Sequence, residues 1–181
     1  MRTVLITAIV AATLSVAHGT TLQQLSLNDM ILKSTAIVRG RVQLTGCTFR
    51  GSNIYTQYTV QVIELWKGPS ATQIKFAVPG GSANGLRQTI AGSPNLTNGQ
   101  EYVLYLWTSR TGLTQIIGLS QGLFVSANGA VTRPSITEHF IDPNGSEAAD
   151  PGMQMTLSAM RTLVSTVLGQ TALGQTGNNV Q

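Results

Sequence analysis

Cysteine is almost absent from this 181-residue chain, in which Cys47 is the only one. A single thiol cannot form an intramolecular disulfide, so packing and hydrogen bonds must hold the fold together. A disulfide-stapled scaffold is therefore excluded. We expect Cys47 to be a small, partly buried residue, and a reactive or dimer-forming thiol is the alternative.

Charged residues are scarce as well, at 10% of the chain, and the formal net charge is only +4. Arg39, Arg41 and Arg50 lie close together in sequence, but nucleic-acid surfaces usually carry denser basic clusters interleaved with aromatic residues. This pattern argues against a nucleic acid as partner. Thr, Ser, Gln and Asn fill many polar positions, which favours an all-β protein outside the cytoplasm.

Long apolar runs are limited to one, Val4–Ala17, which follows Arg2 and is followed by small residues up to Gly19. This arrangement is typical of a signal peptide, which we assign to residues 1–19. We therefore expect the protein to be secreted or periplasmic after cleavage near Gly19. The sequence beyond this run predicts no transmembrane span in the mature chain, because its apolar stretches are too short.

The segment Ile54–Gly68 is the strongest structural signal in the chain. Apolar and polar residues alternate along it, as in a strand with one packed and one wet face. The alternation slips at Ile63, which predicts a β-bulge or strong coiling at this point. Gly40 lies in the middle of another predicted strand, where a missing side chain permits a sharp bend or a close backbone approach.

The remaining pattern predicts further strands around a short N-terminal helix. Glu101–Trp107 is the most apolar run and is expected to be a central strand covered on both faces. Asn128-Gly129 is the strongest hairpin signal. The other predicted elements are a helix over residues 26–34, strands over 35–45, 73–78, 113–119 and 121–127, and an optional edge strand over 86–91.

These elements suggest one domain with extensions. We assign residues 20–133 to a β-barrel domain and residues 134–150 to a polar linker. An apolar stripe of helical period predicts a C-terminal helix over residues 151–169, which caps the barrel or docks onto a partner. Residues 170–181 are expected to be disordered.

The segment Gly80–Asn98 is the candidate binding region, because small β-domains place recognition on long irregular loops. We expect a protein or carbohydrate ligand to bind there and on the neighbouring rim of the barrel. The candidate binding residues are Tyr55, Gly80, Gly81, Asn84, Arg87 and Asn95. The Trp and Tyr side chains are an alternative stacking platform, although strand alternation places most of them in the core, with Tyr55 the most exposed.

Catalytic and metal-binding signals are weak. Glu138, His139 and Asp142 form the only cluster that could hold a divalent ion or a His–Asp base, but a polar loop explains them as well. No cofactor is predicted from these residues. Glu64 should be ion-paired or exposed through the bulge, and Glu101 should be solvated.

Three segments, Ala36–Val42, Tyr58–Gly68 and Leu96–Leu104, together resemble the netrin-like modules, which include the tissue inhibitors of metalloproteinases. The resemblance covers about residues 27–126 and implies a five-stranded OB-type barrel. The chain also resembles a group of uncharacterised secreted bacterial proteins that carry the ending Gly118–Phe124. The expected fold is thus mainly β: a small OB-type antiparallel barrel with a short N-terminal and an amphipathic C-terminal helix.

The resemblance does not extend to protease inhibition. Those inhibitors coordinate the protease's metal through a cysteine at the mature N-terminus, whereas this mature chain would begin at Thr20-Thr21. We therefore expect a non-enzymatic secreted binding module. The alternatives are a hydrolase, weakly metal-dependent or based on His139, and a structural protein of the cell envelope.

Overall fold

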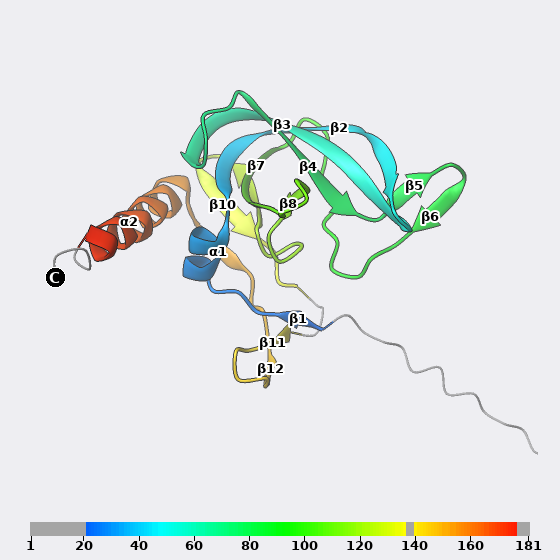
Figure 1. The fold of residues 1–181 in the computed structure, drawn as a ribbon. Coiled ribbons are helices and arrows are strands. Elements are labelled where there is room, and N and C mark those ends of the chain that lie inside the picture. Colours follow the sequence, from blue (N-terminus) through cyan, green and yellow to red (C-terminus); the bar gives the residue numbers. More distant parts are fainter. Residues whose placement is uncertain (1–20, 137–139, 177–181) are drawn as a thin grey trace, which may run out of the picture.

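The structure, a computed structural model, describes residues 21–136 and 140–176 and is mainly β, as predicted (Figure 1). The helices in this part of the chain are α1 (Leu27–Lys33) and α2 (Leu157–Thr176). The longer strands are β2 (Ala36–Arg50), β3 (Asn53–Lys67), β4 (Gln73–Pro79), β7 (Glu101–Thr108), β9 (Leu123–Ala127), β10 (Ala130–Arg133) and β13 (Met153–Thr156). The short strands are β1 (Leu22–Gln23), β5 (Gly81–Ala83), β6 (Leu86–Gln88), β8 (Thr114–Ile116), β11 (Phe140–Ile141) and β12 (Glu147–Ala148).

The main sheet has eight strands in the order β13-β10-β9-β7-β2-β3-β4-β8. β8 also pairs with β7, so the pairings among β2, β3, β4, β8 and β7 form a closed ring. The ring is completed by a short parallel contact, in which Ala77 of β4 lies opposite Gln115 of β8. All other pairings in the ring are antiparallel.

The bulge predicted at Ile63 is confirmed. Gly40 lies opposite Val62 while Arg39 lies opposite Glu64, which leaves Ile63 as the extra residue of β3. The side chain of Ile63 is accordingly 47% exposed. A Cβ atom on Gly40 would lie only 2.2 Å from the carbonyl oxygen of Gln61, so glycine permits the close approach of β2 and β3 here.

Two hydrophobic cores lie on opposite faces of the sheet. The first is built by the ring strands alone, from Ala36, Val38, Val42, Tyr58, Val60, Phe76, Val78, Tyr102, Leu104, Leu106 and Ile116. The second joins the outer face of the sheet to both helices, through Met30, Ile31, Ile37, Val103, Tyr105, Phe124, Val131, Met160, Val164 and Val167. Strand β7 contributes alternate residues to both cores, which confirms the prediction of a central strand covered on both faces.

The hairpin predicted at Asn128-Gly129 is confirmed, and a side-chain hydrogen bond marks the start of α1. Ser26 caps α1, where its Oγ accepts a hydrogen bond from the backbone amide of Asp29. Asn128 and Gly129 connect β9 to β10 with φ angles of 50° and 75°, as a tight hairpin requires.

The structure of the C-terminal region differs from the predictions of a helix over 151–169 and a disordered tail over 170–181. Residues 153–156 form strand β13, which pairs with β10, and the helix runs over 157–176 rather than 151–169. The hydroxyl of Thr156 accepts a hydrogen bond from the amide of Ala159, which explains where the helix begins. Residues 170–176 of the predicted tail are therefore helical, whereas residues 177–181 lie outside the described part.

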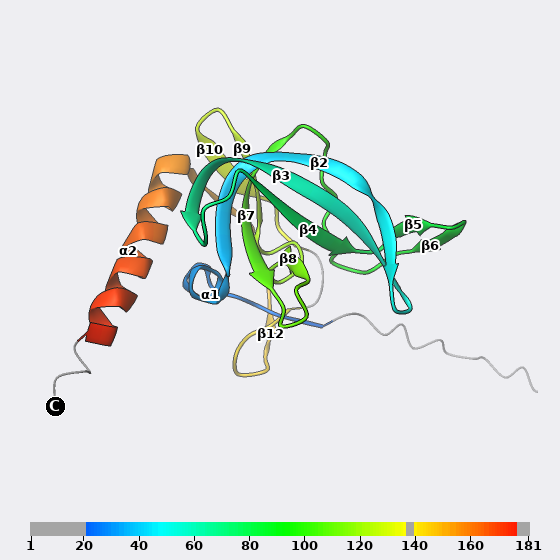
Figure 2. The ribbon, with the colours of Figure 1, turned by 45° about the horizontal axis from the view of Figure 1, so that its top comes forward.

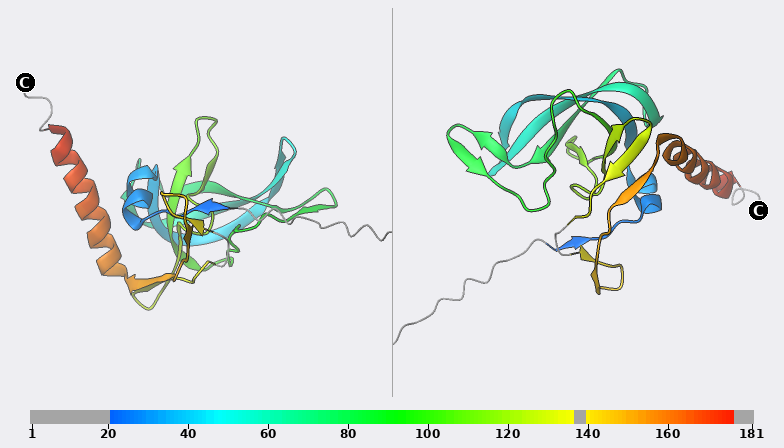
Figure 3. Two further views of the ribbon diagram at one scale, coloured as in Figure 1. Left: turned by 90° about the horizontal axis from the view of Figure 1, so that it is seen from below. Right: turned by 180° about the vertical axis from the view of Figure 1, so that it is seen from behind.

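The apolar stripe of α2 packs on its own domain. Met160, Val164 and Val167 belong to the second core, and α2 lies beside α1 (Figure 2). The last turns of α2 extend away from the sheet (Figure 3). Within the described residues, neither helix has the combination of length and hydrophobicity needed to cross a membrane.

The predicted polar linker over residues 134–150 contains ordered structure. Strands β11 and β12 pair with each other, and β11 also pairs with β1. Arg133 and Asp150 form a buried two-pronged ion pair, with N···O distances of 2.6 and 2.7 Å. These contacts tie the segment to the domain, because an ion pair of this geometry fixes both of its side chains.

Strand β2 is longer than predicted and continues to Arg50. Its far half pairs with β3 alone, because β7 pairs with β2 only as far as Arg41. Cys47 lies in this half and is exposed, so the prediction of a partly buried cysteine is wrong. Its Sγ lies 3.6 Å from Oγ1 of Thr56 on β3.

Candidate functional site

The segment between β4 and β7 forms one wall of an open pocket of about 310 Å³, which we call the hairpin pocket. The β5–β6 hairpin projects from the end of the molecule opposite α2 (Figure 1). The pocket lies between this hairpin, the ends of β3 and β4, and the loop that follows β6. Its lining consists of Thr56, Tyr58, Val78, Pro79, Gly80, Gly81, Ser82, Arg87, Gln88, Thr89, Ile90, Ser93, Pro94 and Asn95.

Close backbone contacts hold the hairpin against β3. The amide of Gly80 donates to the carbonyl of Ile54 at 2.7 Å, and Oγ1 of Thr56 donates to the carbonyl of Gly80 at 2.8 Å. A Cβ atom on Gly81 would lie 2.4 Å from Oγ1 of Thr56, and Gly81 has a φ of +130°. Glycine at this position therefore lets β5 lie directly on β3.

The structure brings four of the six predicted binding residues to this pocket. Gly80, Gly81, Arg87 and Asn95 line it. Tyr55 does not line the pocket, and instead its backbone bridges to Gly80. Asn84 is exposed in the turn at the tip of the hairpin, with a φ of 50°.

The polar side chains at the base of the pocket are already hydrogen-bonded within the chain. Ser93 donates to the carbonyl of Pro79 at 2.5 Å. Gln88 accepts from the amide of Ile54 at 2.7 Å and donates to Oδ1 of Asn53 at 3.3 Å. These bonds fix the side chains of Ser93 and Gln88 in place, so the two residues support the walls of the pocket.

The polar side chains at the rim differ from those at the base. Ser82, Arg87, Thr89 and Asn95 are exposed, and their side chains make no hydrogen bond or ion pair with other described residues. Ser82 lies directly opposite Arg87 across the hairpin, so the two side chains point to the same side. Two hydroxyls, an amide and a guanidinium are thus free to meet a ligand.

Sequence reasoning missed Ser82 and Thr89. The Asn84-Gly85 turn carries a signal for Ser82, since a two-residue hairpin loop pairs Ala83 with Leu86 and hence Ser82 with Arg87. No local signal indicates Thr89, because its position follows from the path of the loop after β6.

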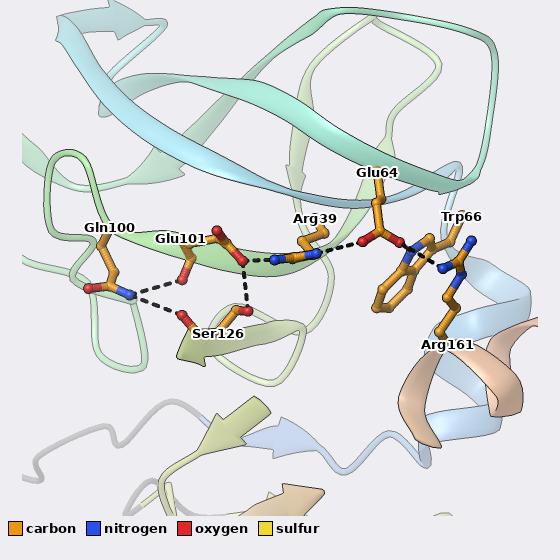
Figure 4. Close-up of polar contacts among 7 residues, drawn as sticks. All are labelled: Arg39, Glu64, Trp66, Gln100, Glu101, Ser126 and Arg161. Atoms are coloured by element: carbon orange, nitrogen blue, oxygen red, sulfur yellow. Dashed lines mark hydrogen bonds and ion pairs between the residues drawn. The ribbon is translucent and has the colours of Figure 1, made fainter. Parts of the chain in front are cut away.

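A second polar cluster, the Arg39 network, crosses the outer face of the sheet (Figure 4). Arg39 of β2 donates from Nη1 to Glu64 of β3 at 2.5 Å and from Nε to Glu101 of β7 at 2.6 Å. Ser126 of β9 donates to the same Glu101 oxygen at 2.9 Å. Four neighbouring strands are therefore connected by charged and polar side chains.

The other carboxylate oxygen of Glu64 is also occupied. Nε1 of Trp66 donates to it at 3.0 Å, and Nη1 of Arg161 on α2 lies 3.4 Å from it. Of the two expectations for Glu64, an ion pair or exposure through the bulge, the structure shows the ion pair. Glu101, expected to be solvated, is instead 18% exposed and paired, because Arg39 on the adjacent strand reaches it.

The electrostatics of this network favour the ionised form of Glu64. The hydrogen bond from Trp66, followed by that from Arg39, lowers the pKa of Glu64, with the charges of Arg161 and Arg39 adding to the effect against desolvation. The bond to Glu101, and then that to Glu64, raises the pKa of Arg39. Glu64 therefore stays charged at neutral pH and is unsuited to donate a proton there.

Of the three candidate metal ligands, the structure describes only Asp142. Glu138 and His139 lie outside the described residues. Asp142 accepts hydrogen bonds from the amides of Asn144 at 2.9 Å and Ser146 at 2.8 Å, and so shapes the β11–β12 turn. No group of three His, Cys, Asp or Glu side chains is gathered within residues 21–136 and 140–176.

The aromatic residues do not form a stacking platform at the pocket. Tyr58, Tyr102 and Tyr105 are buried in the two cores. Trp107 is the more exposed of the two tryptophans, with 43% of its surface accessible, and it does not line the hairpin pocket. Tyr55 is partly buried, so the expectation that it is the most exposed of the Trp and Tyr side chains is wrong.

The chain was compared with family models, with curated proteins and with solved structures. None of the three comparisons found a match.

Proposed function

We propose that this protein is a secreted, non-enzymatic binding module that holds a protein or carbohydrate ligand in the hairpin pocket. The observation that carries the proposal is the contrast within that pocket. Its base is hydrogen-bonded internally, while Ser82, Arg87, Thr89 and Asn95 at its rim have unused polar groups. Preformed walls with free polar groups at the mouth favour binding, because little ordering is needed when a ligand enters.

The proposed scaffold is an OB-type barrel of the netrin-like kind. The closed ring of pairings among β2, β3, β4, β8 and β7 supports this, as does a first core built by those strands alone. The netrin-like assignment rests on the three sequence segments, Ala36–Val42, Tyr58–Gly68 and Leu96–Leu104. In this scaffold the hairpin pocket lies in the connection between the third and fourth ring strands along the chain.

Secretion rests on the sequence of residues 1–19. N-terminal sequencing of the protein recovered from the culture medium or periplasm tests it. A mature chain that begins at Thr20 is expected, and an unprocessed chain found in the cytoplasm would contradict it.

Blocking the pocket tests the binding function. In Asn95→Trp, an exposed side chain at the rim is replaced by a ring large enough to fill the mouth. Gln170→Trp on α2 is the control, since Gln170 is also exposed and lies far from the hairpin (Figure 1). Each protein is immobilised and exposed to the proteins and glycans secreted by its source, and bound material is identified by mass spectrometry.

We expect the wild type and Gln170→Trp to capture the same molecule and Asn95→Trp to lose it, with equal melting temperatures for all three. Capture that is unchanged in Asn95→Trp would show that the ligand binds elsewhere.

A further inference from the structure

The charge around the hairpin pocket is of one sign. Arg87 is the single charged residue in its lining, and it has no ion-pair partner among the described residues. The sequence contains no Asp or Glu from Leu65 to Gln100, which includes the whole segment that forms the hairpin and the loop after it. A ligand in this pocket therefore meets a positive charge that no nearby segment of the loop neutralises.

The free polar groups at the rim indicate the chemical class of the ligand. A guanidinium binds a carboxylate through two parallel hydrogen bonds. The hydroxyls of Ser82 and Thr89 and the amide of Asn95 can each donate and accept, as the hydroxyl groups of a sugar require. One cation surrounded by neutral polar groups matches a molecule with one carboxylate and several hydroxyls.

Other anionic ligands fit these groups less well. A nucleic acid needs several cations to neutralise its phosphates, and Arg87 is alone. An acidic peptide is usually held by pairing along a strand edge or by apolar pockets for its side chains. The free groups at this rim are instead polar side chains, three of them neutral.

The size of the pocket limits the ligand. A volume of about 310 Å³ lies at the low end of the range for small-ligand sites. A second pocket of about 350 Å³ shares Pro94 and Asn95 with it and is lined further by Tyr102, Leu123 and Val125. A short chain of sugar units can occupy the first pocket and continue past Asn95 into the second.

We infer that the hairpin pocket binds a short saccharide containing uronic acid, with the sugar carboxylate on Arg87 and the hydroxyls on Ser82, Thr89 and Asn95. This inference rests on the proposed function, since it names the ligand class of the same pocket. It adds a requirement for a negative charge on the ligand that the proposed function does not make.

Calorimetric titration of the full-length mature protein with paired probes tests the inference. The probes are trisaccharides of galacturonic, glucuronic and mannuronic acid, each with a counterpart whose carboxylates are reduced to alcohols. A hexaglutamate peptide is the non-sugar anion. The proteins are the wild type, Arg87→Gln and the control Arg161→Gln, which removes an exposed arginine on α2 at the opposite end of the molecule.

We expect at least one acidic trisaccharide to bind the wild type and Arg161→Gln equally. Its affinity should fall at least tenfold on carboxylate reduction, and at least tenfold in Arg87→Gln. Because Arg87 is exposed and pairs with none of the described residues, Arg87→Gln should melt at the wild-type temperature.

Three results would overturn the inference: equal binding of acidic and reduced sugars, binding unaffected by Arg87→Gln, or no binding of any trisaccharide. Binding of hexaglutamate in place of the sugars would likewise reject a saccharide and favour an acidic peptide. The proposed function fails separately, when Asn95→Trp leaves capture of the natural ligand unchanged.

Discussion

Arg39 lies between two carboxylates from neighbouring strands, whereas Arg87 lies at the rim of a pocket and pairs with no described residue. Both are carried by strands, Arg39 by the middle of β2 and Arg87 by the β5–β6 hairpin. The side chain of Arg39 is 24% exposed, and its guanidinium is bonded within the chain. An arginine is therefore paired within the fold at the first site and open to a partner from outside at the second.

The comparison indicates how to separate stabilising charges from binding charges in this protein. A partly buried ion needs partners inside the chain, because desolvation without compensation is costly. An exposed ion stays hydrated and gives little stability, so its partner can come from outside. Substitutions in the Arg39 network should change stability, and substitutions at the pocket rim should change binding alone.

The largest effect is expected for Arg39→Met, which leaves Glu64 and Glu101 without their shared cation. We expect a loss of about 2 to 3 kcal/mol in the free energy of unfolding, between the values for exposed and fully buried pairs. Urea denaturation followed by far-UV circular dichroism measures it. The matched variant Arg87→Met should stay within about 0.5 kcal/mol of the wild type. Equal losses in the two variants would remove the distinction between the two arginines.

The second largest effect on the free energy of unfolding is expected for Glu64→Gln, and this effect should depend on pH. The folded state lowers the pKa of Glu64 below its ordinary value of 4.5, so the ionised group stabilises the fold above that pH. We expect Glu64→Gln to lose about 1.5 kcal/mol at pH 7, the value of a charged hydrogen bond.

This stabilisation is lost in the wild type as the pH falls below 4.5 and through the folded pKa. The stability difference between Glu64→Gln and the wild type should therefore shrink in acid. Urea midpoints measured from pH 7 to pH 2 check this. A difference that stays constant over the range would mean that the charge of Glu64 is not what stabilises the fold.

A smaller effect is expected for Trp66→Phe, which keeps an aromatic ring and deletes the hydrogen bond from Nε1 to Glu64. The expected loss is about 1 kcal/mol. Trp107→Phe is the control, because Trp107 is 43% exposed and its Nε1 has no partner among the described residues. Thermal denaturation at neutral pH compares the two. A larger loss in Trp107→Phe would contradict the assigned role of the Trp66 bond.

The smallest effect is expected for Arg161→Gln. Arg161 is 67% exposed and lies 3.4 Å from Glu64, so it resembles a surface ion pair. Its removal should cost at most about 0.5 kcal/mol, and added salt should reduce that cost. A loss as large as that of Arg39→Met, or one insensitive to salt, would place Arg161 among the essential members of the network.

Local patterns predicted much of the fold because they follow from short-range geometry. Alternation along Ile54–Gly68 placed a long strand and, at Ile63, its bulge. The Asn128-Gly129 pair placed a hairpin, since this turn requires positive φ at both residues. The extent of β2 was missed, because its pairing beyond Thr45 depends on β3 rather than on its own alternation. The start of α2 was missed for a similar reason, since β13 forms only by pairing with β10.

The site was predicted only in part. The irregular loop, and four of the residues that line the pocket, followed from the composition of residues 80–98. The division into base and rim did not follow from residue type, because Thr56 and Ser93 differ from Thr89 and Ser82 in hydrogen-bond partners and exposure. Those partners belong to other strands and loops.

The sequence by itself determined that this chain is mainly β, that no disulfide within the chain supports it, and where its strongest strands and turns lie. Each of these depends on residue type or on neighbours along the chain. The tertiary structure alone decided that Arg39 and Glu101 form an ion pair, that Cys47 is exposed, and that Arg87 lies at a pocket without an ion-pair partner among the described residues. Solvation and charge compensation depend on contacts between distant segments, and only the folded chain brings those segments together.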